Sequence, residues 1–221
     1  MTKTLRKKPF DNFKLRILQY LLGFVVLPLG IVTVLSTGLG AGAWDTTSYN
    51  LSAFIGSTLG TASGLINATV MGVVMLYRRK GRFIFMIIPI IGVATFLDFW
   101  DIVVFSNLDI GNYHVLIRLA LFAIGTFIIT FGLSMIILSD FPAGVFDELM
   151  VVFMDVFNTK SVFYTRLGVE MLAIALALVF GMLAGIGFGA VNLGSFVLAV
   201  ILAPILSWQM RWMGAIIYDR S

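Results

Sequence analysis

Long apolar runs separated by short polar segments set the pattern of this 221-residue chain. Each run is close to the roughly 20 residues that a helix needs to cross the hydrocarbon core of a bilayer. The runs are continuous rather than alternating and are rich in glycine, which favours helices over barrel strands. The pattern therefore predicts an all-α membrane protein with six transmembrane helices, at about residues 17–38, 59–77, 83–105, 115–138, 161–183 and 186–207.

The chain contains an internal repeat at an offset of 102 residues. Residues 30–45 align without gaps with residues 132–147, and the core of the match is Ala-Gly-Ala-Trp-Asp at 41–45 against Ala-Gly-Val-Phe-Asp at 143–147. Each core directly follows a predicted span and opens a segment whose apolar residues share one helical face. We predict a short amphipathic or re-entrant helix at each of these two places.

Each half of the repeat then holds three spans, an odd number, so the two halves are expected to have opposite orientations in the membrane. Inverted repeats are common in secondary transporters, whose interrupted helices approach a site near the bilayer midplane. If the amphipathic segments instead cross the membrane, the count becomes four plus four and the repeats run parallel. The predicted division is a basic cytoplasmic segment at 1–16, a first three-span repeat at 17–110, a second at 111–207 and a cytoplasmic tail at 208–221.

Composition supports the membrane assignment, and the charges set its orientation. The chain is 60% hydrophobic and 12% charged, whereas soluble domains are about 45–50% apolar and about 25% charged, which excludes an ordinary soluble enzyme. Of the 15 Lys and Arg residues, all but Arg118 and Arg166 lie on the cytoplasmic side if both termini are inside. Because cytoplasmic loops are rich in Lys and Arg, we predict a multi-pass protein of the bacterial cytoplasmic (inner) membrane with both termini cytoplasmic. We therefore interpret the basic residues as signals of membrane topology and not as a nucleic-acid-binding surface.

Two charged residues within the fifth predicted span are candidates for a substrate or ion pathway. Arg166 and Glu170 are four residues apart and so share one helix face. A charge at bilayer depth costs about 2.5–3.5 kcal/mol on insertion scales, and intramembrane ionisable residues are functional candidates by default. One interpretation is a neutralising structural pair that docks the helix against its neighbours. The other is that Glu170 binds a cation, or carries a proton that Arg166 helps to release.

Four further polar residues complete the candidate pathway. Asp45 and Asp147 are expected to cap the helices that begin there; the alternative is that the two helix N-termini form sites that face a substrate. Asp98 lies near the outer end of the third span, where a carboxylate at the water interface is the simplest interpretation, and Asn67 in the second span can hydrogen-bond between helices. No catalytic, metal or cofactor site is predicted, because there is no cysteine and the sole histidine, His114, stands in an outer loop without a second ligand.

Several motifs resemble, in their order and spacing, the bacterial YczE/YyaS/YitT family of integral membrane proteins. Residues 39–45 are similar to the family's Gly-x-x-Pro-Trp-Asp signature, and residues 142–150 to its Gly-Pro-x-Asp-x-Leu-Met segment. Ala43 stands where the family has Pro, and Ala190 where it has Thr. The other matches are Arg166-x-x-x-Glu170, the glycine-rich turn Gly185–Ala190, Ala203-Pro204 and Asp98. The resemblance covers residues 30–204 and implies a shared fold and a membrane location, without a reaction.

The predicted function is transport of a small molecule or an ion, with proton coupling through Glu170 as one form of it. The rival is a non-transporting membrane scaffold that supports a partner enzyme or complex; an enzyme is not predicted. The expected partners are the lipid bilayer and an unknown small molecule or ion. A homo-oligomer is compatible with the sequence, and no nucleic-acid partner is expected.

Overall fold

The fold is all-helical in the computed structural model, which describes residues 13–79, 81–142, 144–159 and 161–218. Six helical segments there are long and apolar enough to cross a membrane, which agrees with the predicted number. Five of them are α1 (Phe13–Ser36), α3 (Leu59–Arg78), α5 (Val115–Leu138), α7 (Val162–Leu183) and α8 (Leu193–Tyr218). The sixth joins the 3-10 helix η1 (Gly81–Met86), α4 (Ile87–Asp98) and the π-helix η2 (Phe99–Val104). The short helices are α2 (Ala43–Ile55), η3 (Ile110–Asn112) and α6 (Val145–Val156).

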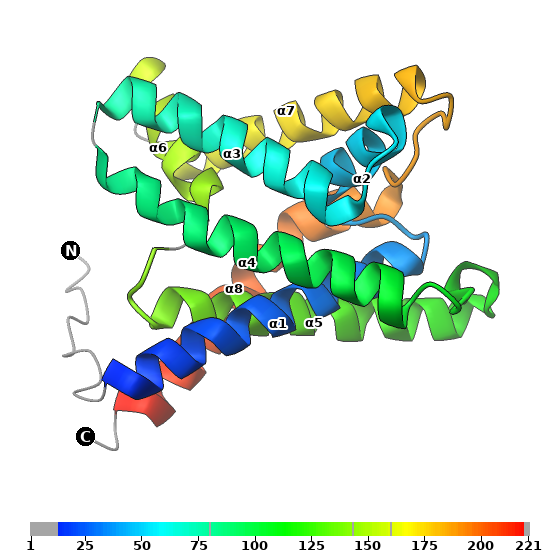
Figure 1. The fold of residues 1–221 in the computed structure, drawn as a ribbon, viewed down its shortest axis with the longest axis horizontal. Helices are drawn as coiled ribbons and strands as arrows, with labels where there is room; N and C mark the ends of the chain where they lie inside the picture. The colour runs from blue at the N-terminus through cyan, green and yellow to red at the C-terminus, as the bar shows by residue number, and fades with distance from the viewer. Residues whose placement is uncertain (1–12, 80, 143, 160, 219–221) are drawn as a thin grey trace.

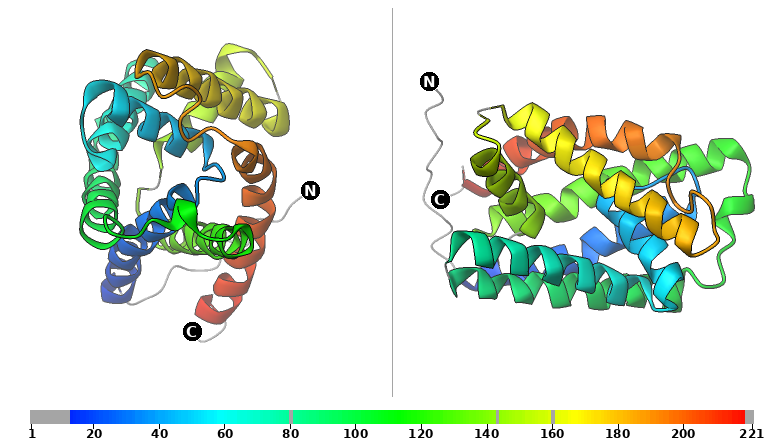
Figure 2. Two further views of the ribbon diagram at one scale, coloured as in Figure 1. Left: turned by 90° about the vertical axis from the view of Figure 1, so that its right-hand side faces the viewer. Right: turned by 90° about the horizontal axis from the view of Figure 1, so that it is seen from above.

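The long helices run along one axis of the molecule, alternately in opposite directions (Figure 1). The start of α1, the end of α3 and the end of α8 lie at the same end of the bundle, together with α6, whereas α2 lies toward the opposite end; a second direction of view agrees (Figure 2). Lys14 and Arg16 at the start of α1, Arg78 at the end of α3 and Arg211 in α8 therefore belong to one end. We call it the basic end.

The two short helices do not cross the bundle. At about 1.5 Å per residue, the 13 residues of α2 and the 12 residues of α6 are about 20 and 18 Å long. The hydrocarbon core of a bilayer is roughly 30 Å thick. The prediction of a short helix after each repeat core is confirmed, and the alternative in which these segments cross and give eight spans is wrong.

Helices α1 and α5 cross at a seam of glycines. A Cβ added to Gly30 would lie 2.5 Å from the backbone nitrogen of Ile129, and one added to Gly132 would lie 2.5 Å from the backbone nitrogen of Leu27. Because both neighbours are backbone atoms, no rotation of a side chain could make room. Glycine therefore allows the two helices to approach this closely.

Reciprocal hydrogen bonds join the ends of α1 and α5. Arg16, near the start of α1, donates from Nε to the carbonyl of Ser139 just beyond α5, at 2.9 Å. Arg118, near the start of α5, donates from Nε to the carbonyl of Thr37 just beyond α1, at 2.7 Å. The two helices are therefore antiparallel, and the residues of the two bonds differ by the same 102 positions as the sequence repeat.

The packing partners of the two halves of the chain also correspond. Helix α1 packs on α4 as α5 packs on α8, and α2 packs on α7 as α6 packs on α3. The α2–α7 contact is made around Asn50, which is fully buried. Its Nδ2 donates to the carbonyls of Ala177 and Phe188, at 2.8 and 3.1 Å, and its Oδ1 accepts from the backbone N–H of Ala190 at 3.0 Å.

The α6–α3 contact is held by weaker polar interactions. The Arg78 guanidinium at the end of α3 lies 3.9 Å from the carboxylate of Glu148 and 3.8 Å from that of Asp155, both on α6. These distances exceed hydrogen-bond length, and half-exposed ion pairs of this kind contribute at most about 1 kcal/mol. Helix α2 is therefore fixed more firmly to its partner than α6 is.

The last span begins later than the apolar pattern predicts. The predicted start is residue 186, whereas α8 starts at Leu193 and continues to Tyr218. Gly185, Gly187 and Gly189 have φ angles of 73°, 66° and 56°, a left-handed conformation that a right-handed helix does not contain. Hydropathy counts this stretch as apolar, but its glycines make it a loop between α7 and α8.

Candidate functional site

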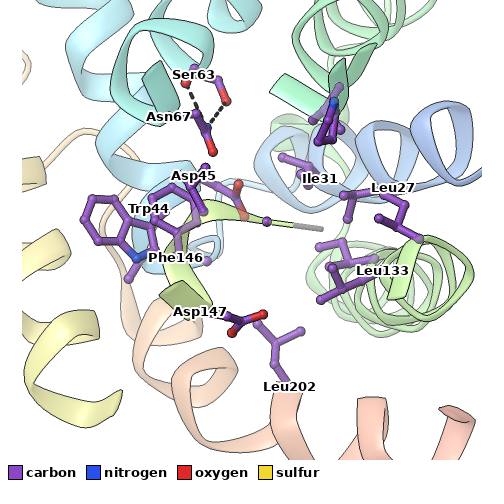
Figure 3. Close-up of a pocket in the computed structure, with 18 of the residues that line it drawn as sticks. Leu27, Ile31, Trp44, Asp45, Ser63, Asn67, Leu133, Phe146, Asp147 and Leu202 are labelled. Atoms are coloured by element: carbon purple, nitrogen blue, oxygen red, sulfur yellow. Dashed lines mark hydrogen bonds between the residues drawn. The ribbon is translucent and has the colours of Figure 1, made fainter. Parts of the chain in front are cut away.

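A cavity of about 240 Å³ lies where the two short helices meet the long ones. Its walls differ in chemistry: polar side chains of α2, α3 and α6 stand on one side and apolar side chains of α1 and α5 on the other (Figure 3). The apolar wall includes Leu27, Ile31 and Leu133. Five of the six predicted pathway residues line the cavity, namely Asp45, Asn67, Asp147, Arg166 and Glu170.

The two repeat cores meet at this cavity. The indole of Trp44 at the start of α2 stacks on the ring of Phe146 at the start of α6, with centroids 4.3 Å apart and ring planes 15° from parallel. The residues before the two helices, Gly42 and Gly144, have nearly the same backbone angles, with φ of −56° and −66° and ψ of 149° in both. Helices α2 and α6 therefore begin with the same backbone geometry. Because their second residues are stacked, the two N-termini lie next to each other at the cavity.

The cap hydrogen bonds predicted for the two aspartates are not formed. Gly42 and Gly144 occupy the N-cap positions, and neither helix has a side-chain cap hydrogen bond. Asp45 and Asp147 stand instead in the first turn, where a carboxylate still interacts favourably with the positive end of the helix dipole. Figure 3 shows both carboxylates directed into the cavity, beside the N-termini of α2 and α6.

Corresponding positions of α3 and α7 supply the remaining polar side chains. Ser63 and Asn67 are the fifth and ninth residues of α3, and Arg166 and Glu170 are the fifth and ninth residues of α7. The Asn67 Nδ2 donates to the Ser63 carbonyl at 2.8 Å and to its hydroxyl at 3.4 Å. The Asn67 side chain thereby turns its Oδ1 away from Ser63 and toward Asp45 (Figure 3).

Four charged side chains of the cavity have no direct partner within the described part of the chain. Neither a hydrogen bond nor an ion pair within 4.0 Å joins Asp45, Asp147, Arg166 or Glu170 to another described residue. Arg166 and Glu170 therefore make no direct ion pair, but the Arg166 charge still acts on the Glu170 carboxylate, so the neutralising structural pair and the pathway role both stay predictions. At about 1.5 Å per residue, Glu170 lies about 12 Å along α7 from its start, inside the span.

The two aspartates differ in their surroundings. Asp45 is half-buried and Asp147 is exposed, and the glycine that precedes each helix follows the same trend, with Gly42 buried and Gly144 exposed. Burial raises the pKa of Asp45 to about 7, and the neighbouring Glu170 carboxylate adds to this by disfavouring a second negative charge. The cavity is thus more open on the α6 side than on the α2 side.

Asp98 stands apart from the cavity. Its Oδ1 accepts from the backbone N–H of Gly60 at 2.6 Å and its Oδ2 from the hydroxyl of Thr58 at 2.7 Å. Thr58 is the N-cap residue of α3 and Gly60 is its second residue, so Asp98 satisfies one free N–H group of that helix and binds the hydroxyl of its N-cap. The carboxylate joins the end of α4 to the start of α3.

Ser63 and the stacked rings were not among the predicted site residues. Ser63 follows from the repeat if the alignment is extended past residue 45. A one-residue change of offset, from 102 to 103, aligns Ser63 and Asn67 with Arg166 and Glu170. Trp44 and Phe146 already occupy matching positions in the repeat core, but a match in sequence does not by itself indicate contact in space.

Comparison with known proteins places this fold in a family without an assigned activity. A family described as "Family of unknown function (DUF6198)" matches residues 14–211. "Uncharacterized protein YyaS" of Bacillus subtilis (strain 168) is 27% identical over 193 residues, which are 87% of this chain and 94% of that protein. "Uncharacterized membrane protein YczE" of the same organism is 27% identical over 173 residues, 78% of this chain and 77% of that protein. No solved structure matches the chain significantly.

Proposed function

We propose that this chain, which belongs to the DUF6198 family of membrane proteins, is a secondary transporter whose substrate site is the cavity between α2 and α6. The observation that carries the proposal is the set of four charged side chains that line the cavity without a direct partner among the described residues. A charge placed at bilayer depth is costly unless it is paired or solvated. A small molecule or ion that binds in the cavity would pair with these charges and offset their cost.

An inverted repeat gives such a site a mechanism. We infer that residues 17–110 and 111–207 form halves of opposite orientation, with the basic end in the cytoplasm. The antiparallel α1–α5 pair, its reciprocal arginine bonds and the corresponding packing of the other helices support this arrangement. In inverted-repeat transporters, the two halves exchange roles as the site opens to one face and then to the other.

The unequal attachment of the short helices indicates which face is open. Helix α2 is fixed to α7 through the buried Asn50 amide, whereas α6 is held to α3 by the half-exposed ion pairs of Arg78. Together with the exposure of Asp147, this difference supports a state in which the cavity is closed on the α2 side and accessible from the basic end. In the opposite state, α6 would be fixed and α2 would loosen.

The orientation of the halves can be tested by side-specific labelling, because the chain has no cysteine of its own. Ala53 on α2 and Val156 on α6 are both exposed. A membrane-impermeant maleimide should label Ala53→Cys from the outside of intact cells and Val156→Cys only in inside-out vesicles. Labelling of both variants from the same face would contradict the inverted repeat.

Transport itself can be tested with purified protein in proteoliposomes. We expect the wild-type chain to move at least one member of a panel of small cations, zwitterions and anions down an imposed gradient. Glu170→Gln should abolish that flux, and Asp109→Asn, which changes an exposed carboxylate of the loop after η2, should leave it unchanged. If wild type, Glu170→Gln and empty vesicles behave alike for every compound, the scaffold function is favoured instead.

A further inference from the structure

We propose that the cavity binds a small monovalent organic cation in exchange for a proton. This inference rests on the proposed transport function and names the class of substrate. The balance of charge in the cavity, the shape of its walls and its hydrogen-bonding groups support this class of ligand.

The cavity carries an excess of negative charge. Its described lining contains three carboxylates (Asp45, Asp147 and Glu170) and one guanidinium (Arg166), so the side chains sum to −2 when all are ionised. The N-termini of α2 and α6 each contribute about +0.5, which leaves roughly −1. A monovalent cation would neutralise this remainder, whereas a zwitterion would leave it and an anion would double it.

The hydrogen-bonding groups point to the same class. The three carboxylates only accept, and the Oδ1 of Asn67 is a further acceptor to which no described residue donates. Arg166 is the one charged donor among the described lining residues. A ligand with a positive charge, or with N–H and O–H donors, therefore complements the site.

The apolar wall favours an organic cation over a bare metal ion. Leu27, Ile31 and Leu133 stand opposite the polar side chains (Figure 3), so a ligand that fills the cavity needs an apolar body as well as a charged head. The described acidic residues form no cluster with the spacing of a metal site. The volume of about 240 Å³ is below the roughly 300–1,000 Å³ of drug-sized sites, which favours a ligand smaller than a drug-sized molecule.

A proton on Asp45 is the natural competitor of the cation. The groups that face Asp45 are Glu170 and Arg166 from α7, Asp147 from α6 and Asn67 from α3, whereas α1, α4, α5 and α8 contribute only apolar lining. The raised pKa of Asp45 means that this carboxyl is partly protonated near neutral pH. An entering cation supplies the positive charge that the proton supplied, so the proton leaves Asp45 for water and the charge of the cavity is unchanged.

A set of three matched probes tests the proposal by calorimetric titration of the full chain in nanodiscs. Choline is a small organic cation, 3,3-dimethylbutan-1-ol is its uncharged carbon isostere, and glycine betaine is its zwitterionic relative. We expect choline to bind at least tenfold more tightly than either of the others. Binding should weaken from about pH 8 to about pH 5.5, and the apparent enthalpy should vary with the ionisation enthalpy of the buffer because a proton is released.

Variants separate a role in binding from a role in folding. Glu170→Gln and Asp45→Asn should each weaken choline binding at least tenfold, and Asp45→Asn should also remove the dependence on buffer ionisation. Asp109→Asn should bind as wild type does. Equal binding of choline and its neutral isostere, or no binding of choline to wild type, would overturn the cation class. Flux of an anion or a zwitterion alone would overturn it while leaving transport intact, whereas choline binding without flux of any compound would overturn transport and leave the cation site.

Discussion

Alanine at the α1–α5 crossing is the sharpest structural perturbation that the chain offers. A Cβ at Gly30 would stand 2.5 Å from the Ile129 nitrogen and 2.8 Å from the Gly125 carbonyl oxygen, and one at Gly132 would stand 2.5 Å from the Leu27 nitrogen. Ordinary contacts of carbon atoms are about 3.5–4 Å, so the helices must separate by roughly 1 Å. Overpacking of this kind typically costs about 1–3 kcal/mol.

Gly72 of α3 provides the matched control. A Cβ there would meet nothing within 4 Å, and replacement of glycine by alanine within a helix gains up to about 1 kcal/mol. Because all three glycines lie within helices, this gain is common to the three variants, and Gly30→Ala and Gly132→Ala should be less stable than Gly72→Ala by the packing cost alone, about 1–3 kcal/mol. The free energy of unfolding can be measured in mixed micelles titrated with SDS and followed by far-ultraviolet circular dichroism. If the crossing variants are as stable as Gly72→Ala, the close approach of α1 and α5 is refuted.

Three further predictions concern the helices around the cavity. Asn50→Ala should destabilise the fold by about 1–3 kcal/mol, because the half-buried N–H of Ala190 loses its acceptor and the buried carbonyl of Ala177 loses a donor; the same unfolding titration measures it, and an unchanged value would contradict the contact. Because the pKa of Asp45 rises from 3.8 to about 7 on folding, wild type should lose stability as the pH rises from about 4 to about 7; Asp45→Asn should show less of this loss, and identical profiles would refute the assignment. Gly42→Ala places a Cβ 2.5 Å from the Asp45 carboxylate, whereas Gly144→Ala meets nothing within 4 Å, so only the former should weaken choline binding.

The spans and short helices could be predicted because they depend on local sequence. The apolar runs located the spans, and the repeat located α2 and α6. The start of α8 was missed because hydropathy does not register the left-handed backbone of Gly185, Gly187 and Gly189. The seam of glycines between α1 and α5 depends on which helices meet, and the sequence pattern does not contain that information.

The candidate site could be predicted in part for the same reason. Charges in spans are costly and therefore rare, which makes Arg166 and Glu170 candidates, and the repeat makes Asp45 and Asp147 candidates. Which of these residues share a cavity depends on tertiary packing. That packing brings the four together and directs Asp98 to the start of α3 instead.

Accessibility of the cavity from the two membrane faces tests the transport account most directly, because it requires no known substrate. Ser63 lines the cavity, is only 8% exposed and differs from cysteine by one atom. We predict that a membrane-impermeant methanethiosulfonate modifies Ser63→Cys rapidly from the face at the basic end and more slowly, but to completion, from the opposite face. Modification from one face alone, however long the exposure, would show a cavity that does not alternate and would contradict the proposed function.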